Sequence, residues 1–159
     1  RDLLMAKKYG VIWWRGVKVD RHTRRAVEWA EKDCGLTFRI AQGSYNRGGV
    51  SASAGTHDAG ATIDVGLAGI SQTNRKKILR SLKRAGFAAW IRYDWQGFPP
   101  HIHAIAFGNS KASAGAKAQR RSYDQGRDGL ARNRPDPDPW RTKRKRKFSF
   151  ILRRPVWRI

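Results

Sequence analysis

The sequence has little cysteine, little acid and no long hydrophobic run. Its single cysteine, Cys34, excludes an intramolecular disulfide framework and any zinc finger that needs several cysteine ligands. No run of about 18 apolar residues occurs, so we predict no transmembrane helix. The first residues lack a charged segment followed by an apolar stretch and a small-residue cleavage site, so we predict no secretory signal.

Positive charge is what the sequence has in excess. The 159 residues include 34 Lys and Arg but only 12 Asp and Glu, which gives a formal net charge of +22. Such a surface attracts polyanions, chiefly nucleic acid, wall polymers of the teichoic-acid type or an anionic membrane. The seven Trp, four Tyr and six Phe, in a chain that is 40% hydrophobic, exclude wholesale disorder.

The charge is unevenly distributed along the chain. Residues 1–108 hold 18 Lys and Arg against 8 Asp and Glu, a net charge of +10, whereas residues 109–159 hold 16 against 4, a net charge of +12. The second segment also contains the proline-rich stretch 135–139 and a basic run at 141–147. We therefore predict a folded domain over 1–108 and a basic, proline-containing C-terminal tail over 109–159.

Local patterns in the first segment predict helices and strands in alternation. Asp20 is a suitable N-cap and Gly35 a suitable terminator for a helix between them, and Ser71 can cap a second helix that runs to about residue 85. The glycine- and serine-rich stretch 43–60 predicts a long loop, and loops of this length in a compact domain carry function or are mobile. Strands are predicted at 36–41, 61–66, 87–93 and 101–107. This order indicates an α+β fold, with a small, mostly antiparallel sheet and helices on one side of it.

Histidines and one aspartate mark a candidate site. His57 and Asp64 lie seven residues apart, and His101 and His103 form a His-x-His pair on a predicted strand, where both side chains point to one face. Asp64 lies in an apolar stretch where an unpaired carboxylate would be costly, so a cation partner is expected. Two histidines and one carboxylate that leave a fourth position open for water are a ligand set used by catalytic zinc. Either His101 or His103 would then be left as an acid, a base or an oxyanion stabiliser.

The segment from Ser53 to Asp64, followed by the His-x-His pair, resembles the M15 family of zinc peptidases. These are D-Ala-D-Ala carboxypeptidases and L-Ala-D-Glu endopeptidases that cut peptidoglycan stem peptides. The family pattern is Ser-x-His-x-x-Gly-x-Ala-x-Asp, then His-x-His or Glu-x-x-His. His57, Gly60 and Asp64 are in register with it, whereas Thr56 and Thr62 depart from it. The segment 42–46 resembles a subgroup that is common in phages of actinobacteria and in their hosts.

The resemblance implies a small α+β fold of the Hedgehog and DD-peptidase type, and zinc held by His57, Asp64 and His103. It implies that His101 lies at the site without ligating, where it stabilises developing charge or relays a proton. The Glu of the Glu-x-x-His branch is replaced by Pro100, which leaves the general base open. Asp94, the nearest acidic residue upstream of the pair, is a candidate for that role.

Many family members also place an arginine on the strand before the long loop. Gln42 occupies roughly that place, and its amide can donate to an oxyanion but cannot form an ion pair. Arg39, Arg47 and Arg92 are alternatives for binding an anionic stem peptide.

Two functions are expected from these observations. The resemblance implies a zinc-dependent peptidase that cleaves the stem peptide of the bacterial cell wall. Its setting would be a phage endolysin, monomeric and held in the host cytoplasm before release to the wall, or associated with the virion. The alternative is a nonenzymatic protein that binds nucleic acid or wall polymers and has a structural or degenerate zinc site. The tail contains no base-reading motif, so nucleic-acid binding would be nonspecific.

Overall fold

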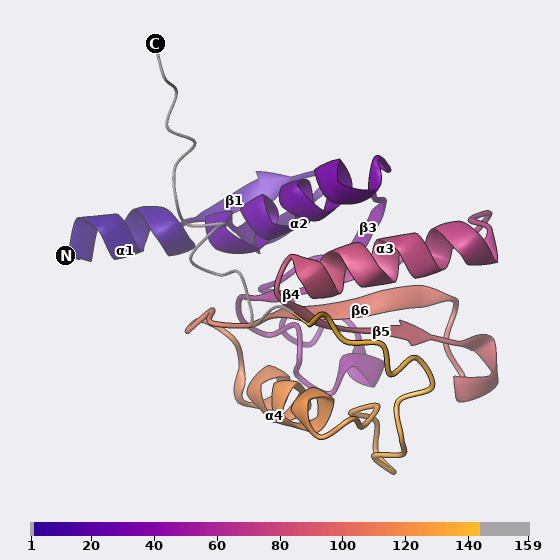
Figure 1. The fold of residues 1–159 in the computed structure, drawn as a ribbon. Helices are drawn as coiled ribbons and strands as arrows, with labels where there is room; N and C mark the ends of the chain where they lie inside the picture. The colour runs from indigo at the N-terminus through magenta and orange to yellow at the C-terminus, as the bar shows by residue number, and fades with distance from the viewer. Residues whose placement is uncertain (1, 144–159) are drawn as a thin grey trace.

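The structure, a computed structural model, describes residues 2–143 (Figure 1). Residues 144–147 of the basic run, and the rest of the tail after them, lie outside the described residues. The elements follow in the order α1 (Asp2–Tyr9), β1 (Val11–Trp14), β2 (Val17–Asp20), α2 (Arg21–Cys34), β3 (Ile40–Gln42), η1 (Ser51–Ser53), β4 (Thr62–Gly66), α3 (Gln72–Arg84), β5 (Phe87–Arg92), η2 (Asp94–Gln96), β6 (His101–Ala106) and α4 (Ala114–Asp124). Within these described residues, no helix combines the length and the apolar character needed to cross a membrane.

A four-stranded sheet in the order β3-β4-β6-β5 forms the centre of the molecule, and all its pairs are antiparallel. A hairpin of β1 and β2 forms a second, two-stranded sheet. Helices α2 and α3 lie together on one side of the four-stranded sheet (Figure 1). The predicted α+β fold with an antiparallel sheet is thereby confirmed.

The two predicted helices begin and end where their capping residues place them. The Asp20 carboxylate accepts a hydrogen bond from the Thr23 amide at the start of α2, and Gly35 ends that helix in the left-handed conformation. The Ser71 hydroxyl accepts from the Asn74 amide at the start of α3. These local bonds hold the two helices whose apolar faces cover the sheet.

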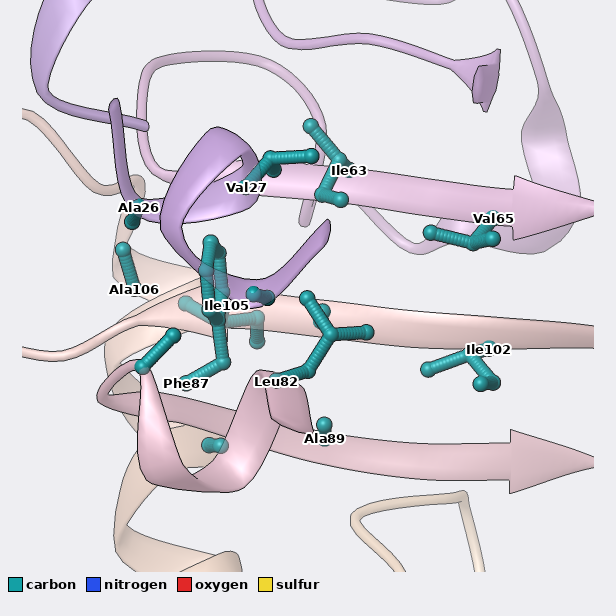
Figure 2. Packing of buried hydrophobic residues seen from close by; sticks show 14 of the residues in the cluster. Ala26, Val27, Ile63, Val65, Leu82, Phe87, Ala89, Ile102, Ile105 and Ala106 are labelled. Atoms are coloured by element: carbon teal, nitrogen blue, oxygen red, sulfur yellow. The ribbon is translucent and has the colours of Figure 1, made fainter. Parts of the chain in front are cut away.

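The core lies between the sheet and the pair of helices (Figure 2). Val27 of α2 and Leu82 of α3 are fully buried there, together with Ile63, Val65 and Ile102 of the two central strands. Burial of side chains of this size contributes about 1.5–3 kcal/mol each. The core therefore fixes β4 and β6, whose other face is free to carry polar groups.

The structure corrects the predicted domain boundary at residue 108. Helix α4 lies on the face of the sheet opposite α2 and α3 (Figure 1), so the helices do not all lie on one side. Its residues Ala116 and Tyr123, seven apart and thus on one helical face, are both buried. The Tyr123 ring meets the Trp90 ring edge-on at a centroid distance of 5.5 Å. The high charge of this segment concealed the few apolar residues that attach it to the sheet.

The chain after α4 is also attached to the domain. The ammonium group of Lys83 donates to the carbonyl oxygens of Asp138 and Trp140, at 2.7 and 2.9 Å. Burial, helped by the charge of Arg141, lowers the pKa of Lys83 to about 7. The Asp138 carboxylate in turn accepts from the Tyr93 hydroxyl at 2.7 Å. The proline-rich stretch is therefore part of the folded unit, which extends to the end of the described residues.

Candidate metal centre

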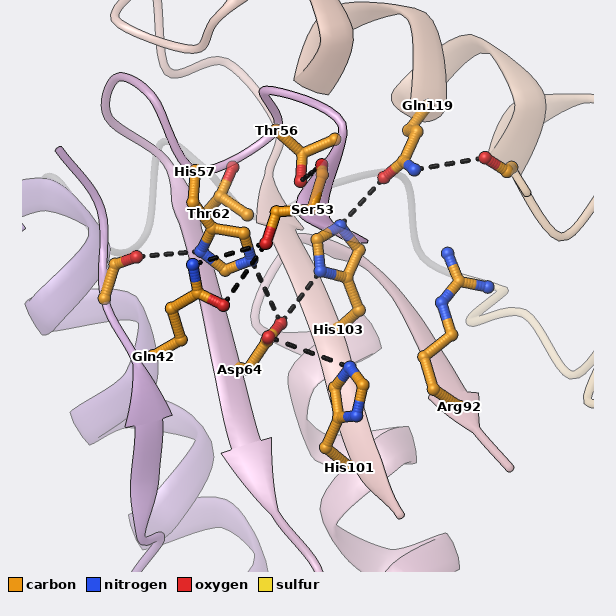
Figure 3. A network of polar contacts seen from close by, with 12 residues as sticks. Gln42, Ser53, Thr56, His57, Thr62, Asp64, Arg92, His101, His103 and Gln119 are labelled. Carbon is orange, nitrogen blue, oxygen red and sulfur yellow. Dashed lines mark hydrogen bonds and ion pairs between the residues drawn. The ribbon is translucent and has the colours of Figure 1, made fainter. Parts of the chain in front are cut away.

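Strands β4 and β6 supply the floor of the candidate site. Asp64 is paired with His103, and Gly66 with His101. Because side chains alternate along a strand, residues 64 and 66 share one face, as do residues 101 and 103. This is the face away from α2 and α3, and the side chains meet there (Figure 3).

A bulge in β3 brings two more polar residues to the same face. Ile40 pairs with Val65 and Gln42 pairs with Asp64, so one extra residue lies between the two pairs. In a regular strand, Arg39 and Gln42 would point to opposite faces because they are three residues apart. With the bulge, both line the same cavity as Asp64. The strand predicted over 36–41 is observed only at Ile40–Gln42. It starts late because the Phe38 amide donates to the Glu31 side chain rather than to a sheet partner.

The long loop 43–60 delivers His57, whose side chain is only 1% exposed. The loop is fastened to the sheet by the Ser44 hydroxyl, which donates to the Thr62 carbonyl at 2.7 Å. The Asn46 amide donates to the His57 carbonyl at 2.8 Å. The loop thus brings His57 to the cluster and is held in place by its own polar groups.

At Gly60 the loop passes very close to the rest of the domain. A Cβ atom there would lie 2.6 Å from Asp20 Oδ2 and 2.9 Å from Tyr45 Oη, so only glycine fits. Asp20 Oδ2 accepts from the Ala61 amide at 3.0 Å. The close approach at Gly60 is made to Asp20 and Tyr45 rather than to the candidate ligands. The N-cap of α2 fixes the entry to β4.

Three side chains converge at the centre of the site (Figure 3). Asp64 Oδ1 lies 3.2 Å from His57 Nε2 and 2.8 Å from His103 Nδ1. One ligand atom from each residue lies within 4.8 Å of the other two, and all three residues are buried. These are the three residues that the family resemblance implies as zinc ligands.

Both nitrogens of each imidazole face an acceptor, so a neutral ring can donate to only one of its two partners. His57 Nδ1 lies 2.8 Å from the Gly43 carbonyl oxygen, which can only accept, and its Nε2 faces Asp64. His103 Nε2 lies 2.8 Å from Gln119 Oε1, while the amide nitrogen of Gln119 donates to the Gly129 carbonyl at 3.1 Å. A cation at Asp64 would place the protons on the outer atoms, His57 Nδ1 and His103 Nε2, and would leave lone pairs on His57 Nε2 and His103 Nδ1.

With the protons on the outer atoms, both lone pairs point at the Asp64 carboxylate. Three electron-rich atoms at this separation repel one another unless a cation lies among them. Two imidazole nitrogens and one carboxylate oxygen are a donor set for Zn²⁺ that leaves a fourth position for water. The acceptors behind the rings, Gly43 and Gln119, are the outer partners that such ligands require. The residues present therefore fit a zinc ion.

The protonation states also suit a metal. Burial alone would raise the pKa of Asp64, but the neighbouring imidazoles of His103 and His57 outweigh it and hold that pKa far below its usual range. Burial is the largest cause that lowers the pKa of His103 to about 4, against the opposing effect of Asp64. At neutral pH the carboxylate is ionised and the His103 ring is neutral, which are the forms that ligate.

His101 lies beside the cluster and is not a member of it. Its Nδ1 is 2.7 Å from the Pro99 carbonyl oxygen and therefore carries the proton. Its Nε2 carries a lone pair and lies 3.7 Å from Asp64 Oδ2. The structure thus places His103 among the candidate ligands and leaves a proton acceptor on His101 next to them.

The cluster opens into a cavity of about 330 Å³. Gln42 and Ser53 line one wall, and their side chains are joined by long contacts of 3.3 and 3.4 Å. Arg92 and Gln119 line another wall, and residues 97–100 form a third. The cavity therefore brings an amide, a histidine and guanidinium groups to the candidate metal site.

The structure does not bring Asp94 to this cavity. Its carboxylate is exposed and accepts a hydrogen bond from the Trp95 amide at 2.8 Å, at the start of η2. Asp94 as general base is therefore corrected, because its carboxylate is bonded to the neighbouring Trp95 amide and does not line the cavity. Gln119, conversely, was missed by sequence reasoning, since it lies in the segment interpreted as a tail. The alanine-rich stretch after Ser113 could have predicted helix α4, because Ser113 is its N-cap.

Comparison of the chain with protein-family models, with curated proteins and with solved structures gives no match. The geometry of the cluster and the sequence motif are therefore the observations from which a function can be proposed.

Proposed function

We propose that the protein is a zinc-dependent peptidase that cleaves the stem peptide of bacterial peptidoglycan. The observation that carries the proposal is the convergence of two buried imidazole nitrogens and a buried carboxylate on one point of a cavity, with an acceptor behind each ring. His57, Asp64 and His103 would hold the ion. Zinc bound there would polarise a carbonyl group and lower the pKa of a bound water.

His101 supplies the proton chemistry in this proposal. Its Nε2 atom has a free lone pair that faces the site, because Nδ1 is occupied by the Pro99 carbonyl. It can accept a proton from the attacking water and pass it to the leaving amine. Once protonated, the same atom can donate to the oxyanion that forms on the carbonyl. If His101 acts in this way, the site does not need the general base that the Glu-x-x-His branch of the family has.

Gln42 is placed to orient the substrate. Its amide is held only by the long contacts with Ser53, so it can turn to donate to a carbonyl oxygen in the cavity. Gly66, the last residue of β4, has no side chain, and the exposed Arg39 side chain lies across it at the edge of the cavity. These features favour a peptide amide as the bond at which the site acts.

Peptidoglycan as the substrate is supported by the motif from Ser53 to Asp64 and by the charge. A net charge of +22 attracts the protein to an anionic wall by long-range forces that salt screens. We propose that the protein serves as a wall-degrading lysin of phage type. Binding of polyanions without catalysis is the competing function.

The proposal is tested by digestion of purified bacterial wall with the full chain, followed by mass spectrometry of the released muropeptides. We expect peptide fragments whose release stops with a chelator and returns with zinc. Asp64→Asn should abolish release, whereas Asp94→Asn, which changes a carboxylate outside the cavity, should preserve it. Release that persists in chelator would contradict zinc catalysis. Wall binding without any release would favour the nonenzymatic function.

A further inference from the structure

Arg92 is a buried cation on the wall of the cavity. It ends strand β5 as the register partner of His101, and only 2% of the residue is exposed. Figure 3 shows its side chain on the same side of the sheet as His101 and His103. Its Nη1 atom donates to the Asp128 carbonyl at 2.7 Å, and its guanidinium carbon lies 4.9 Å from the centre of the Trp90 ring. The group is thus held in one place from two sides.

The guanidinium is incompletely paired. Within residues 2–143, its Nη2 atom is buried and has no hydrogen-bond partner, and Arg92 forms no ion pair with a carboxylate. Its pKa is raised only by the longer-range charge of neighbouring carboxylates, those of Asp128, Asp64 and Asp136. Burial lowers the pKa of Arg92 to about 10, which still leaves it charged at neutral pH. A buried charge without its counter-ion is costly, so its retention at a cavity wall points to an anionic ligand.

We propose that Arg92 forms a carboxylate-binding subsite of the cavity and selects peptides that carry a carboxylate close to the bond that is cut. The selection of a peptide substrate rests on the proposed function, but the binding of a carboxylate does not. Arginine suits this ligand because its planar fork can donate two parallel hydrogen bonds to the two oxygens of a carboxylate.

The distance between the subsite and the cluster limits where that carboxylate can lie. Arg92 is on the strand next to His101, and Asp64 is on the strand beyond. Strands are about 5 Å apart, so the two points are separated by roughly 5–10 Å, or one to three residues of extended peptide. The carboxylate is therefore either the C-terminus of the substrate or an acidic side chain near the scissile bond.

Arg39 is the second arginine that lines the cavity. It is less suited than Arg92 to be a fixed carboxylate-binding group, because its side chain is exposed to water. Arg39 is exposed and its guanidinium lies across Gly66, where an added Cβ would fall 1.8 Å from its Nη2 atom. An exposed guanidinium is solvated by water, so its charge needs no ligand to balance it.

The test measures binding to the full chain without zinc, so that a carboxylate cannot bind the metal instead. The probes are N-acetyl-D-alanine with its amide, and N-acetyl-D-glutamate α-amide with N-acetyl-D-glutamine α-amide. We expect one of the two carboxylates to bind about tenfold or more tightly than its uncharged partner. The pair that shows the difference identifies the source, C-terminal or side-chain. Equal binding of acid and amide in both pairs overturns the proposal.

Variants assign the effect to a residue. Arg92→Gln should reduce the preference to less than about twofold, whereas Arg75→Gln, which removes a guanidinium bonded to carbonyls of Ile70 and Leu67, should leave it intact. A folded Arg92→Gln protein that keeps the preference, or its loss in Arg39→Gln instead, overturns the assignment. If Arg92→Gln does not fold, the side-chain Nε–H resonance of Arg92 in the parent protein decides. It should shift with the preferred acid and not with its amide, and an unchanged resonance overturns the proposal.

Hydrolysis separates this proposal from the proposed function. A protein that binds the carboxylate selectively but releases no wall peptides supports the subsite and contradicts the peptidase. Zinc-dependent release of wall peptides by a protein with no carboxylate preference supports the peptidase and contradicts the subsite.

Discussion

At the scale of single residues, the two candidate histidine ligands are oriented by acceptors of different kinds. A backbone carbonyl holds His57 and a side-chain amide holds His103. Only the second of these can be removed by mutation. Gln119 is therefore the residue at which the orientation of a ligand can be tested without changing any ligand.

Replacement of Gln119 with Leu removes the acceptor behind His103 and should weaken zinc binding by about 10–100-fold. Gln119→Glu keeps an acceptor oxygen at the same position and should restore the affinity. Competition with a chromogenic chelator measures both, and the visible spectrum of the cobalt-substituted protein reports the ligand field. A folded Gln119→Leu variant with the parent's zinc affinity would contradict the role of this side chain.

His101 should separate catalysis from metal binding. Because it lies beside the cluster rather than within it, His101→Ala should keep zinc and lose about 10²–10⁴-fold in turnover. Metal analysis and a soluble peptide substrate provide the two readouts. Loss of zinc from this variant would show that the roles of His101 and His103 have been assigned wrongly.

At the scale of elements, the sequence predicts those whose signals are local. Helices α2 and α3 follow from Asp20, Gly35 and Ser71, and the shared face of His101 and His103 follows from strand alternation. The choice of His103 over His101 as a ligand came only from the family resemblance.

The elements that the sequence did not predict depend on packing. The bulge in β3 is set by the partners of Ile40 and Gln42 across the sheet. Helix α4 was not predicted, because its two buried residues lie within a strongly basic segment. The β1–β2 hairpin was missed although Arg15-Gly16 is a turn pair, and both residues have positive φ angles, 53° and 78°. No local pattern places Gln119 behind His103.

Helix α2 carries a pH-dependent contribution to stability at His22, which is 1% exposed. Burial is the main cause that lowers the pKa of His22 from 6.5 to about 4. An unfolded chain binds this proton more readily than the folded one, so the contribution is complete above pH 6.5 and is lost as the pH falls towards 4. Between pH 7.5 and pH 5, the parent should lose about 2 kcal/mol more in the free energy of unfolding than His22→Gln. Urea unfolding at both pH values tests this, and identical pH dependence in the two proteins would refute it.

At the scale of the whole molecule, the boundary of the folded unit decides which truncations survive. Removal of residues 110–159 takes away Gln119, Tyr123 and the carbonyl that accepts from Trp90 Nε1, so it should destabilise the domain by at least about 3 kcal/mol and abolish zinc binding. This replaces the expectation, drawn from charge alone, that the first 108 residues form the complete domain.

Removal of residues 144–159 should have a different effect. The cluster and the supporting contacts described above lie within residues 2–143, so zinc binding and hydrolysis of a soluble peptide should be preserved. The removed segment carries seven Lys and Arg and no Asp or Glu, so binding to whole wall should weaken and become less dependent on salt. Sedimentation with purified wall at low and high salt measures the change. Unaltered salt dependence would place the wall-binding charge in the folded unit.

The central claim is that His57, Asp64 and His103 bind zinc, and metal analysis of the dialysed full-length protein at neutral pH tests it most directly. We predict one zinc ion per chain in the parent and none in Asp64→Asn, which keeps the size of the side chain but removes its charge. A parent protein without zinc, or an Asp64→Asn variant that retains it, would contradict the account.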